Sequence, residues 1–186
     1  MPFTPTTFPG LIIIEPVILE DSRGYFFESY NENIFRENNI HVTFVQDNQS
    51  KSVYGVVRGL HYQRPPHAQS KLIRVLSGTI IDTVLDLRTG SPTYGETFSI
   101  QLSSDNKKQL FIPKGFAHGF SVISETAEVM YKCDSYYNRE SESGILFNDP
   151  QLKINWEIPV EKTHVSEKDR LLPLFNSYTG DFAFVQ

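Results

Sequence analysis

His61 and Lys71, near the middle of the sequence, could together carry out proton-transfer chemistry. The segment ending in Arg58-Gly59-Leu60-His61 is followed by a turn at Pro65-Pro66, and Lys71 then opens the apolar run LIRVL. The two side chains are therefore predicted to lie on consecutive strands. A neutral imidazole can remove a proton beside a carbonyl while an ammonium stabilises the developing oxyanion, which catalyses enolisation. Each residue alone also has a structural explanation, as a hydrogen-bonded core histidine and as a solvated lysine at a strand end.

The elements that must position these residues are short strands. Apolar and β-branched runs recur, and turn residues such as Ser77-Gly78 and Lys114-Gly115 separate them. The runs are LIII, VIL, YFF, VTFV, KLIRVLSGTIIDTVLDL, TFSIQL, QLFI, GFSVI and EVMY. This pattern predicts an all-β sandwich or barrel. Helices are expected only from Asn31 through Glu37 and near Ser166, where Ser166 and Asp169 have the spacing of a capping box.

Length and composition indicate one globular domain. The chain has 186 residues, of which 39% are hydrophobic and 21% are charged, and a domain commonly has roughly 150 residues. No repeat or linker divides the sequence. We therefore expect a single domain over residues 1–186, in which the residues from about 170 form a C-terminal appendage.

Charge and motif content exclude several classes of function. The net charge of −5 is the opposite of a nucleic-acid-binding balance, so no nucleic-acid partner is expected, although a local group of Arg and Lys could bind a small anion. No apolar run approaches the roughly 18 residues of a membrane helix. The N-terminus lacks the features of a signal peptide, so we expect a cytoplasmic protein with a reduced Cys133 and no membrane partner. The motifs GxGxxG, GxxxxGK[ST], HExxH and GxSxG do not occur.

Ten ordered segments of the sequence resemble one family. They are DSRGYFFE, QDN, RGLHYQ, PPHAQSKLIRVLSG, SPTYG, NKKQLFIPKGFAHGF, ETAEVMYK, YY, FNDP and SEKD. In this order and spacing, from about residue 10 to residue 170, they resemble the dTDP-4-dehydrorhamnose 3,5-epimerases. The resemblance implies a cupin-like jelly roll (a double-stranded β-helix) with short peripheral helices, a homodimer, and no metal or organic cofactor. It also implies inversion at C3 and C5 of dTDP-4-dehydro-6-deoxy-D-glucose, on the route to dTDP-L-rhamnose.

The motifs that correspond to a cupin metal site lack two ligands. Such sites generally use HxH followed by Glu, and then a His after PxG. Here the first motif reads His61-Tyr62-Gln63 with Lys71 in the place of Glu, and the second, Pro113-Lys114-Gly115-Phe116-Ala117-His118, retains its His. A protonated ammonium repels a divalent cation and offers it no lone pair. The sequence therefore predicts an acid/base site without metal, rather than a metal-dependent oxygenase.

By resemblance, four residues carry the reaction. His61 is the general base and Asp169 orients it, because a carboxylate bonded to one ring nitrogen fixes the tautomer and raises the basicity of the other. Lys71 would hold the C4 oxygen as it becomes an enolate. Tyr131 would return a proton from the opposite face of the sugar, since a base that returned its own proton would regenerate the starting configuration. Spacing alone leaves two alternatives open: Asp169 as a helix-start residue and Tyr131 as a buried strand tyrosine.

The resemblance also implies a substrate-binding set. Arg23 and Arg58 would bind the diphosphate through bidentate guanidinium contacts, and Lys168 would add positive charge. His118 would assist the reaction or line the pocket. The other members of the set, most of which would hold the thymidine, are Phe26, Glu28, Gln46, Asn48, Tyr137 and Glu142. Some of these contacts are expected to come from the neighbouring subunit.

Two other functions remain open at this point. An epimerase that acts on only one of the carbons C3 and C5 would use the same residues. A non-catalytic sugar-nucleotide-binding cupin, or a structural β-module, would keep the fold without the reaction. The complete set of His61, Lys71, Tyr131 and Asp169 favours an enzyme over this last possibility.

Overall fold

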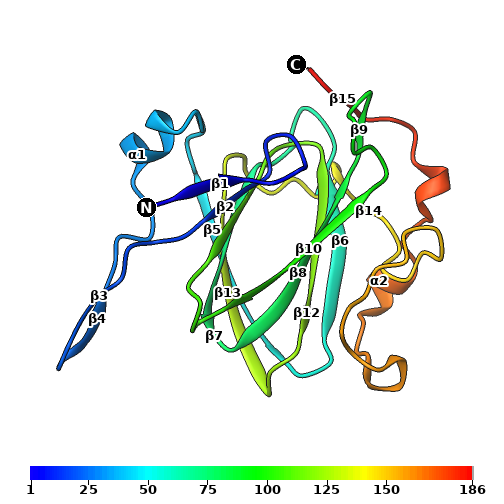
Figure 1. Ribbon diagram of the computed structural model, residues 1–186. Coiled ribbons are helices and arrows are strands. Elements are labelled where there is room, and N and C mark those ends of the chain that lie inside the picture. Colours follow the sequence, from blue (N-terminus) through cyan, green and yellow to red (C-terminus); the bar gives the residue numbers. More distant parts are fainter. Residues whose placement is uncertain (186) are drawn as a thin grey trace.

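Two facing antiparallel sheets form the body of the protein, in a computed structural model that describes residues 1–185 (Figure 1). The strands of the six-stranded sheet are β1 (Phe3–Pro5), β2 (Ile12–Ile14), β5 (Gln46–Val53), β7 (Lys71–Ser77), β11 (Gln109–Ile112) and β13 (Thr126–Cys133). Those of the five-stranded sheet are β6 (Val57–Gln63), β8 (Thr79–Asp86), β10 (Thr97–Ser103), β12 (Phe116–Val122) and β14 (Glu142–Gly144). The spatial orders are β1-β2-β11-β7-β13-β5 and β10-β8-β12-β6-β14. Successive strands alternate between the two sheets from β5 to β8 and again from β10 to β14, and the predicted cupin-like jelly roll is confirmed.

Apolar side chains fill the space between the two sheets. Because side chains alternate along a strand, every second residue of β7 points inward and meets every second residue of β8 and β12. Ile73 and Val75 thus pack in one cluster with Ile80, Val84 and Phe120. Full burial of one such side chain contributes about 1.5–3 kcal/mol relative to exposure. This core holds the two sheets together.

The outer face of the six-stranded sheet is covered near its edge by α1 (Glu32–Glu37). Phe35 of this helix is fully buried against Ile14 and Leu72 of the sheet. Asn31 caps the helix by accepting hydrogen bonds from backbone N–H groups of the first turn. The helix predicted from Asn31 is confirmed.

The outer face of the five-stranded sheet is covered by the chain after β14. This part contains the 3-10 helix η1 (Val160–Lys162), α2 (Glu167–Arg170) and the 3-10 helix η2 (Phe175–Ser177), which lie on the right in Figure 1. Their neighbours, Trp156 among them, bury Leu60 of β6. The short helix expected near Ser166 is confirmed as α2.

Two smaller pairs of strands complete the fold. β3 (Leu19–Asp21) and β4 (Gly24–Phe26) form a hairpin that projects away from both sheets, at the lower left of Figure 1. β15 (Phe182–Ala183), close to the C-terminus, pairs in parallel with β9 (Arg88–Thr89). In residues 1–185 no helix has the length and apolarity needed to cross a bilayer.

One expected strand does not form. The run VTFV at residues 42–45 has no strand structure. Its side chains Val42 and Phe44 instead pack beside Phe35 in the cluster beneath α1. An apolar alternating run can bury its side chains without joining a sheet, and here tertiary packing prevails over strand propensity.

Candidate active site

One cavity between the sheets brings together the residues predicted to do the chemistry. It has a volume of about 390 Å³, and His61, Lys71 and Tyr131 all line it. His61 lies on β6 of the five-stranded sheet, whereas Lys71 and Tyr131 lie on the adjacent strands β7 and β13 of the six-stranded sheet. The base and the acid expected from the sequence therefore reach the cavity from facing sheets.

His61 is bonded to Asp169, far along the chain. The distance from His61 Nε2 to Asp169 Oδ1 is 2.8 Å, and the carboxylate is 6% exposed while the imidazole is 32% exposed. Asp169 lies in α2, where Ser166 Oγ accepts a hydrogen bond from its backbone N–H. Asp169 therefore lies in the first turn of a short helix and is also hydrogen-bonded to the histidine.

A close backbone approach at Gly59 gives Asp169 its second hydrogen bond. The Gly59 N–H donates to Asp169 Oδ2 at 3.1 Å. Gly59 has a φ of 107°, and a Cβ there would lie 2.6 Å from the carbonyl oxygen of His118. Only glycine fits this position, which sits two residues before the histidine on the same strand. Burial raises the pKa of Asp169, but the hydrogen bonds and charge of His61, with those of Gly59 and Ser166, outweigh it and the net pKa is lowered.

Lys71 and Tyr131 are neighbours on the inner face of the six-stranded sheet. Tyr131 is opposite Ile73 in the β13–β7 register, so Lys71 is its diagonal neighbour, and the Lys71 Nζ lies 6.0 Å from the centroid of the tyrosine ring. Burial lowers the pKa of Lys71, and the charges of Cys133, Asp82 and Glu142 oppose that shift. Burial also raises the pKa of Tyr131. A neutral phenol and a desolvated ammonium therefore share this wall of the cavity.

A second histidine and carboxylate pair lies deeper between the sheets. His118 on β12 is the cross-strand neighbour of His61 on β6, but its Nε2 is bonded to Asp82 Oδ2 at 2.8 Å. His118 is 7% exposed, Asp82 is fully buried, and His118 is not among the residues that line the 390 Å³ cavity. Asp82 Oδ1 is buried and makes no hydrogen bond with any group of residues 1–185. The negative charge of Asp82 acts on Lys71, which links this pair to the cavity through its field.

The predicted metal-free chemistry stays a prediction. Within residues 1–185, no three or more His, Cys, Asp or Glu side chains are grouped so as to hold a metal ion. The two histidines of the cupin motifs, His61 and His118, each have one ring nitrogen engaged by a carboxylate. A lysine occupies the remaining position of the motif, as the sequence indicated.

Four of the predicted nucleotide-binding residues stand at the mouth of the cavity, and hydrogen bonds connect them. The Gln46 Nε2 donates to Asn48 Oδ1 at 3.1 Å, and the Tyr137 N–H donates to Gln46 Oε1 at 2.9 Å. The Tyr137 hydroxyl donates to Glu142 Oε2 at 2.7 Å. Asn48 also donates to the buried Cys133 Sγ at 3.7 Å. These contacts preorganise amide and carboxylate groups around an aromatic ring, a combination suited to a nucleobase.

Two of the predicted cations lie beside the base. Arg58 and Lys168 line an adjoining cavity of about 440 Å³, which His61 and Asp169 also border. Lys168 Nζ is 2.6 Å from Glu142 Oε1, so an ion pair joins the adjoining cavity to the mouth of the first one. Arg58 donates from Nε to Ser52 Oγ and leaves the rest of its guanidinium exposed. An anion could be bound here next to the reacting group.

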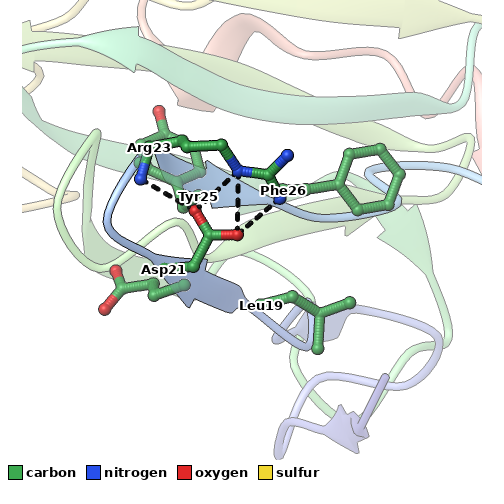
Figure 2. Close-up of a pocket in the computed structure, with 7 residues that line it drawn as sticks. Leu19, Asp21, Arg23, Tyr25 and Phe26 are labelled. Carbon is green, nitrogen blue, oxygen red and sulfur yellow. Dashed lines mark hydrogen bonds and ion pairs between the residues drawn. The ribbon is translucent and has the colours of Figure 1, made fainter.

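The remaining predicted residues are not brought to this cavity within one chain. Arg23 and Phe26 are on the projecting β3–β4 hairpin, and Glu28 follows it. Figure 2 shows the Arg23 guanidinium folded back on Asp21, with a 2.6 Å contact between Nη2 and Oδ2. Phe26 is 69% exposed. Large exposed aromatic surface of this kind commonly marks a contact site.

Sequence reasoning missed four residues of the site. Tyr62, Gln63 and Gln69 line the cavity, and Asp82 is hydrogen-bonded to His118. Gln63 is two residues from His61 on β6, so strand alternation alone places it on the same face. Asp82 interrupts the apolar run TIIDTVL, and a lone acid in a fully buried strand was the signal for a buried pair.

Fold and site together define a class of protein, a cupin-like jelly roll with an acid/base site between its sheets and nucleotide-binding groups at the mouth. The family model described as dTDP-4-dehydrorhamnose 3,5-epimerase matches residues 5–177. The chain belongs to this family, as its sequence motifs predicted.

Known members resemble the chain over almost its whole length. A dTDP-4-dehydrorhamnose 3,5-epimerase of Methanothermobacter thermautotrophicus is 50% identical over 169 residues, which cover 90% of this chain and 91% of the relative. The structure of dTDP-6-deoxy-D-glucose-3,5-epimerase from Legionella pneumophila, in complex with dTDP-4-keto-L-rhamnose, has a TM-score of 0.94 at 44% identity and covers 100% of this chain and 98% of its own. The structure of a mutant of a 3'-monoepimerase from Streptomyces bikiniensis, in complex with dTDP, has a TM-score of 0.87 at 28% identity. The match covers 93% of this chain and 87% of the relative.

Proposed function

We propose that the protein is a dTDP-4-dehydrorhamnose 3,5-epimerase that needs no cofactor. The observation that carries this proposal is the placement of His61 and Tyr131 on facing sheets of one cavity, with Lys71 beside the tyrosine. The substrate would be dTDP-4-dehydro-6-deoxy-D-glucose. Family membership and the dTDP-sugar complex of the Legionella pneumophila relative support this choice.

The reaction proceeds through an enolate. His61 removes the proton on the carbon next to the C4 ketone, and the electron pair of the broken C–H bond moves onto the C4 oxygen. The Lys71 ammonium stabilises that oxygen. Asp169 stabilises the imidazolium and keeps its free nitrogen aimed at the sugar.

Inversion follows from delivery of a proton on the other face. Tyr131 gives its phenolic proton to the same carbon, the C=O bond re-forms, and the configuration is reversed. Burial raises the pKa of Tyr131, so the phenol enters each cycle protonated. His61 then loses its proton and Tyr131 regains one by exchange with solvent. A second round at the other α-carbon gives the L-lyxo sugar.

Binding of the nucleotide would involve two subunits. Gln46, Asn48 and Tyr137 would hold the thymidine at the mouth, and Arg58 would bind the diphosphate. The hairpin with Arg23 and Phe26, followed by Glu28, extends away from its own cavity. In a homodimer it would reach the cavity of the partner and complete the site there. We place this homodimer in the cytoplasm.

Heavy-water NMR tests the proposal directly. The purified protein is incubated with dTDP-4-dehydro-6-deoxy-D-glucose in deuterium oxide, and the sugar is followed by NMR. We expect deuterium at both C3 and C5 together with the L-lyxo product. Absence of exchange at both carbons would overturn the enzymatic function and leave the non-catalytic sugar-nucleotide-binding cupin.

A single-carbon epimerase is the second candidate. It rests on the Streptomyces bikiniensis 3'-monoepimerase, which has the same fold at 28% identity. Deuterium at C3 or C5 alone, with a product inverted only there, would establish this activity instead.

A further inference from the structure

The C-terminal segment, defined as Tyr178–Val185, packs behind the strand that carries the proposed base. It begins just after residue 177, where the match to the family model ends. Tyr178 stacks on Phe175 with the rings 13° from parallel, and the Phe182 N–H donates to the Tyr178 hydroxyl at 3.2 Å. The segment therefore makes contacts within itself and with Phe175 of η2, in addition to its contacts with the sheet.

The C-terminal segment contacts β6 at Tyr62, through ring packing and a hydrogen bond. The Tyr62 ring makes edge contacts with Tyr178 and Phe182, at centroid distances of 6.1 and 5.9 Å. Its hydroxyl donates to Asp181 Oδ2 at 3.2 Å. Tyr62 is only 7% exposed, and a buried phenol needs such a partner.

The far end of the C-terminal segment also makes contacts that do not involve Tyr62. β15 pairs with β9, and the guanidinium of Arg88 lies 4.3 Å from the ring centroid of Phe116 and 5.1 Å from that of Phe184. Arg88 is in turn bonded to the fully buried Asp86. The segment can therefore act as a rigid support and not as a free tail.

The strand register connects this support to the cavity. Tyr62 is opposite Ser143 of the edge strand β14. The flanking pairs are His61 with Gly144 and Gln63 with Glu142. His61, Gln63 and Glu142 line the cavity on the other side of this part of the sheet. Tyr62 also borders the cavity, but its side chain packs in the outer cluster with Tyr178 and Phe182. An edge strand has one neighbour only, so its position depends strongly on that single ladder and on what supports it from behind.

We propose that the C-terminal segment is a positioning element of the epimerase site, which acts through the hydrogen bond between Tyr62 and Asp181 to hold the β6–β14 ladder in place. Asp181 and Tyr62 are positioning residues in this assignment, because they act on His61 and Glu142 from the outer face of the sheet. The kinetic part of the assignment rests on the proposed function, and the structural part does not.

Conservative variants of the contact test the proposal. Tyr62→Phe removes only the hydroxyl, and Asp181→Ala removes only the acceptor, so both variants keep the ring packing. We expect kcat/KM for the dTDP-sugar to fall about threefold to tenfold in each, because small displacements of catalytic groups are costly. Asp181→Asn keeps an acceptor oxygen and should restore kcat/KM to within about twofold of wild type. Tyr30→Phe, a matched change on the outer face of the other sheet, should leave kcat/KM unchanged.

Amide hydrogen exchange supplies a readout that does not depend on activity. Peptides that span β14 should exchange about threefold or more faster in Tyr62→Phe and Asp181→Ala than in wild type, Asp181→Asn or Tyr30→Phe. A melting temperature unchanged within about 2 °C would separate this local effect from global loss of stability. If β14 exchanges at the wild-type rate in both variants, or Asp181→Asn behaves like Asp181→Ala, the assignment is wrong. Should the wild-type protein prove inactive, the exchange result still decides the positioning role, and only the proposed function fails.

Discussion

The Lys71 Nζ lies 6.0 Å from the centroid of the Tyr131 ring, and both residues belong to the sheet opposite His61. Burial acts on the two groups in opposite directions, since it lowers the pKa of Lys71 and raises that of Tyr131. The neutral lysine and the neutral phenol are both favoured by the same dry environment. As the pH rises, Lys71 therefore loses its proton earlier, relative to an ordinary lysine, while Tyr131 keeps its proton longer than an ordinary tyrosine.

This pair predicts the alkaline limb of the pH profile. In the proposed mechanism Lys71 acts as an ammonium, so kcat/KM should fall as the pH rises through the lowered pKa of Lys71, below the ordinary lysine value of about 10.4. Lys71→Arg should move the limb upward, because a guanidinium stays charged to about pH 12 or above. Steady-state profiles of both proteins give the comparison. An unchanged limb in Lys71→Arg would assign it to another group.

His61→Ala should reduce kcat by about 10²-fold or more while the affinity for dTDP stays near the wild-type value, because the variant lacks the base but keeps the nucleotide contacts. Asp169→Asn should also lower kcat, since the Nε2 contact of His61 is altered. Rates and calorimetric binding of dTDP provide the measurement. His41→Ala, at an exposed position, is the control. A loss of stability with normal turnover would instead identify His61 as a structural residue.

Tyr131→Phe should separate exchange from inversion. The variant retains His61 and Lys71, so the enolate can still form and take up deuterium from the solvent on the face of the base. Reprotonation from the other face should be reduced about 10²-fold. NMR in deuterium oxide should then show deuterated starting sugar with little inverted product. Inversion at the wild-type rate would remove Tyr131 from the role of acid.

Substitution of Asp86, which lies away from the cavity, should lower the free energy of unfolding strongly. Its buried carboxylate accepts hydrogen bonds from Arg88, Ser91 and Thr93. Asp86→Ala leaves the buried Arg88 charge unpaired and should cost about 3–5 kcal/mol in the free energy of unfolding, measured by urea denaturation. The matched control is Asp21→Ala, which breaks the exposed Arg23 pair and should have no measurable effect.

The sequence was sufficient to predict most of the strands and the residues His61, Lys71 and Tyr131 of the cavity. The turn at Pro65-Pro66 and the apolar run after it placed His61 and Lys71 on consecutive strands, and the capping-box spacing at Ser166 marked α2. These are local signals that neighbouring residues determine. These local signals predict the elements correctly because the packing of the folded chain favours the same secondary structure.

Other features depend on contacts between distant residues and could not be derived from spacing. The bond between Asp169 and His61 joins positions far apart in the chain, and only the family resemblance pointed to it. The lone acid Asp82 in an apolar strand indicates a buried pair, but spacing does not identify His118 as its partner. The run at residues 42–45 has the alternation of a strand, but its side chains are used to pack beneath α1. Tertiary packing decides such cases.

The proposed base His61 and the proposed acid Tyr131 belong to different sheets, so the distance between them depends on how the two sheets pack. The distance between the sheets depends on the volume of the core side chains Ile73, Val84 and Phe120. None of these residues needs to touch the sugar. A methyl group gained or lost among them would widen or narrow the gap while every proton-carrying side chain stayed the same. The size and pucker of the ring that the enzyme accepts can therefore evolve through its apolar interior.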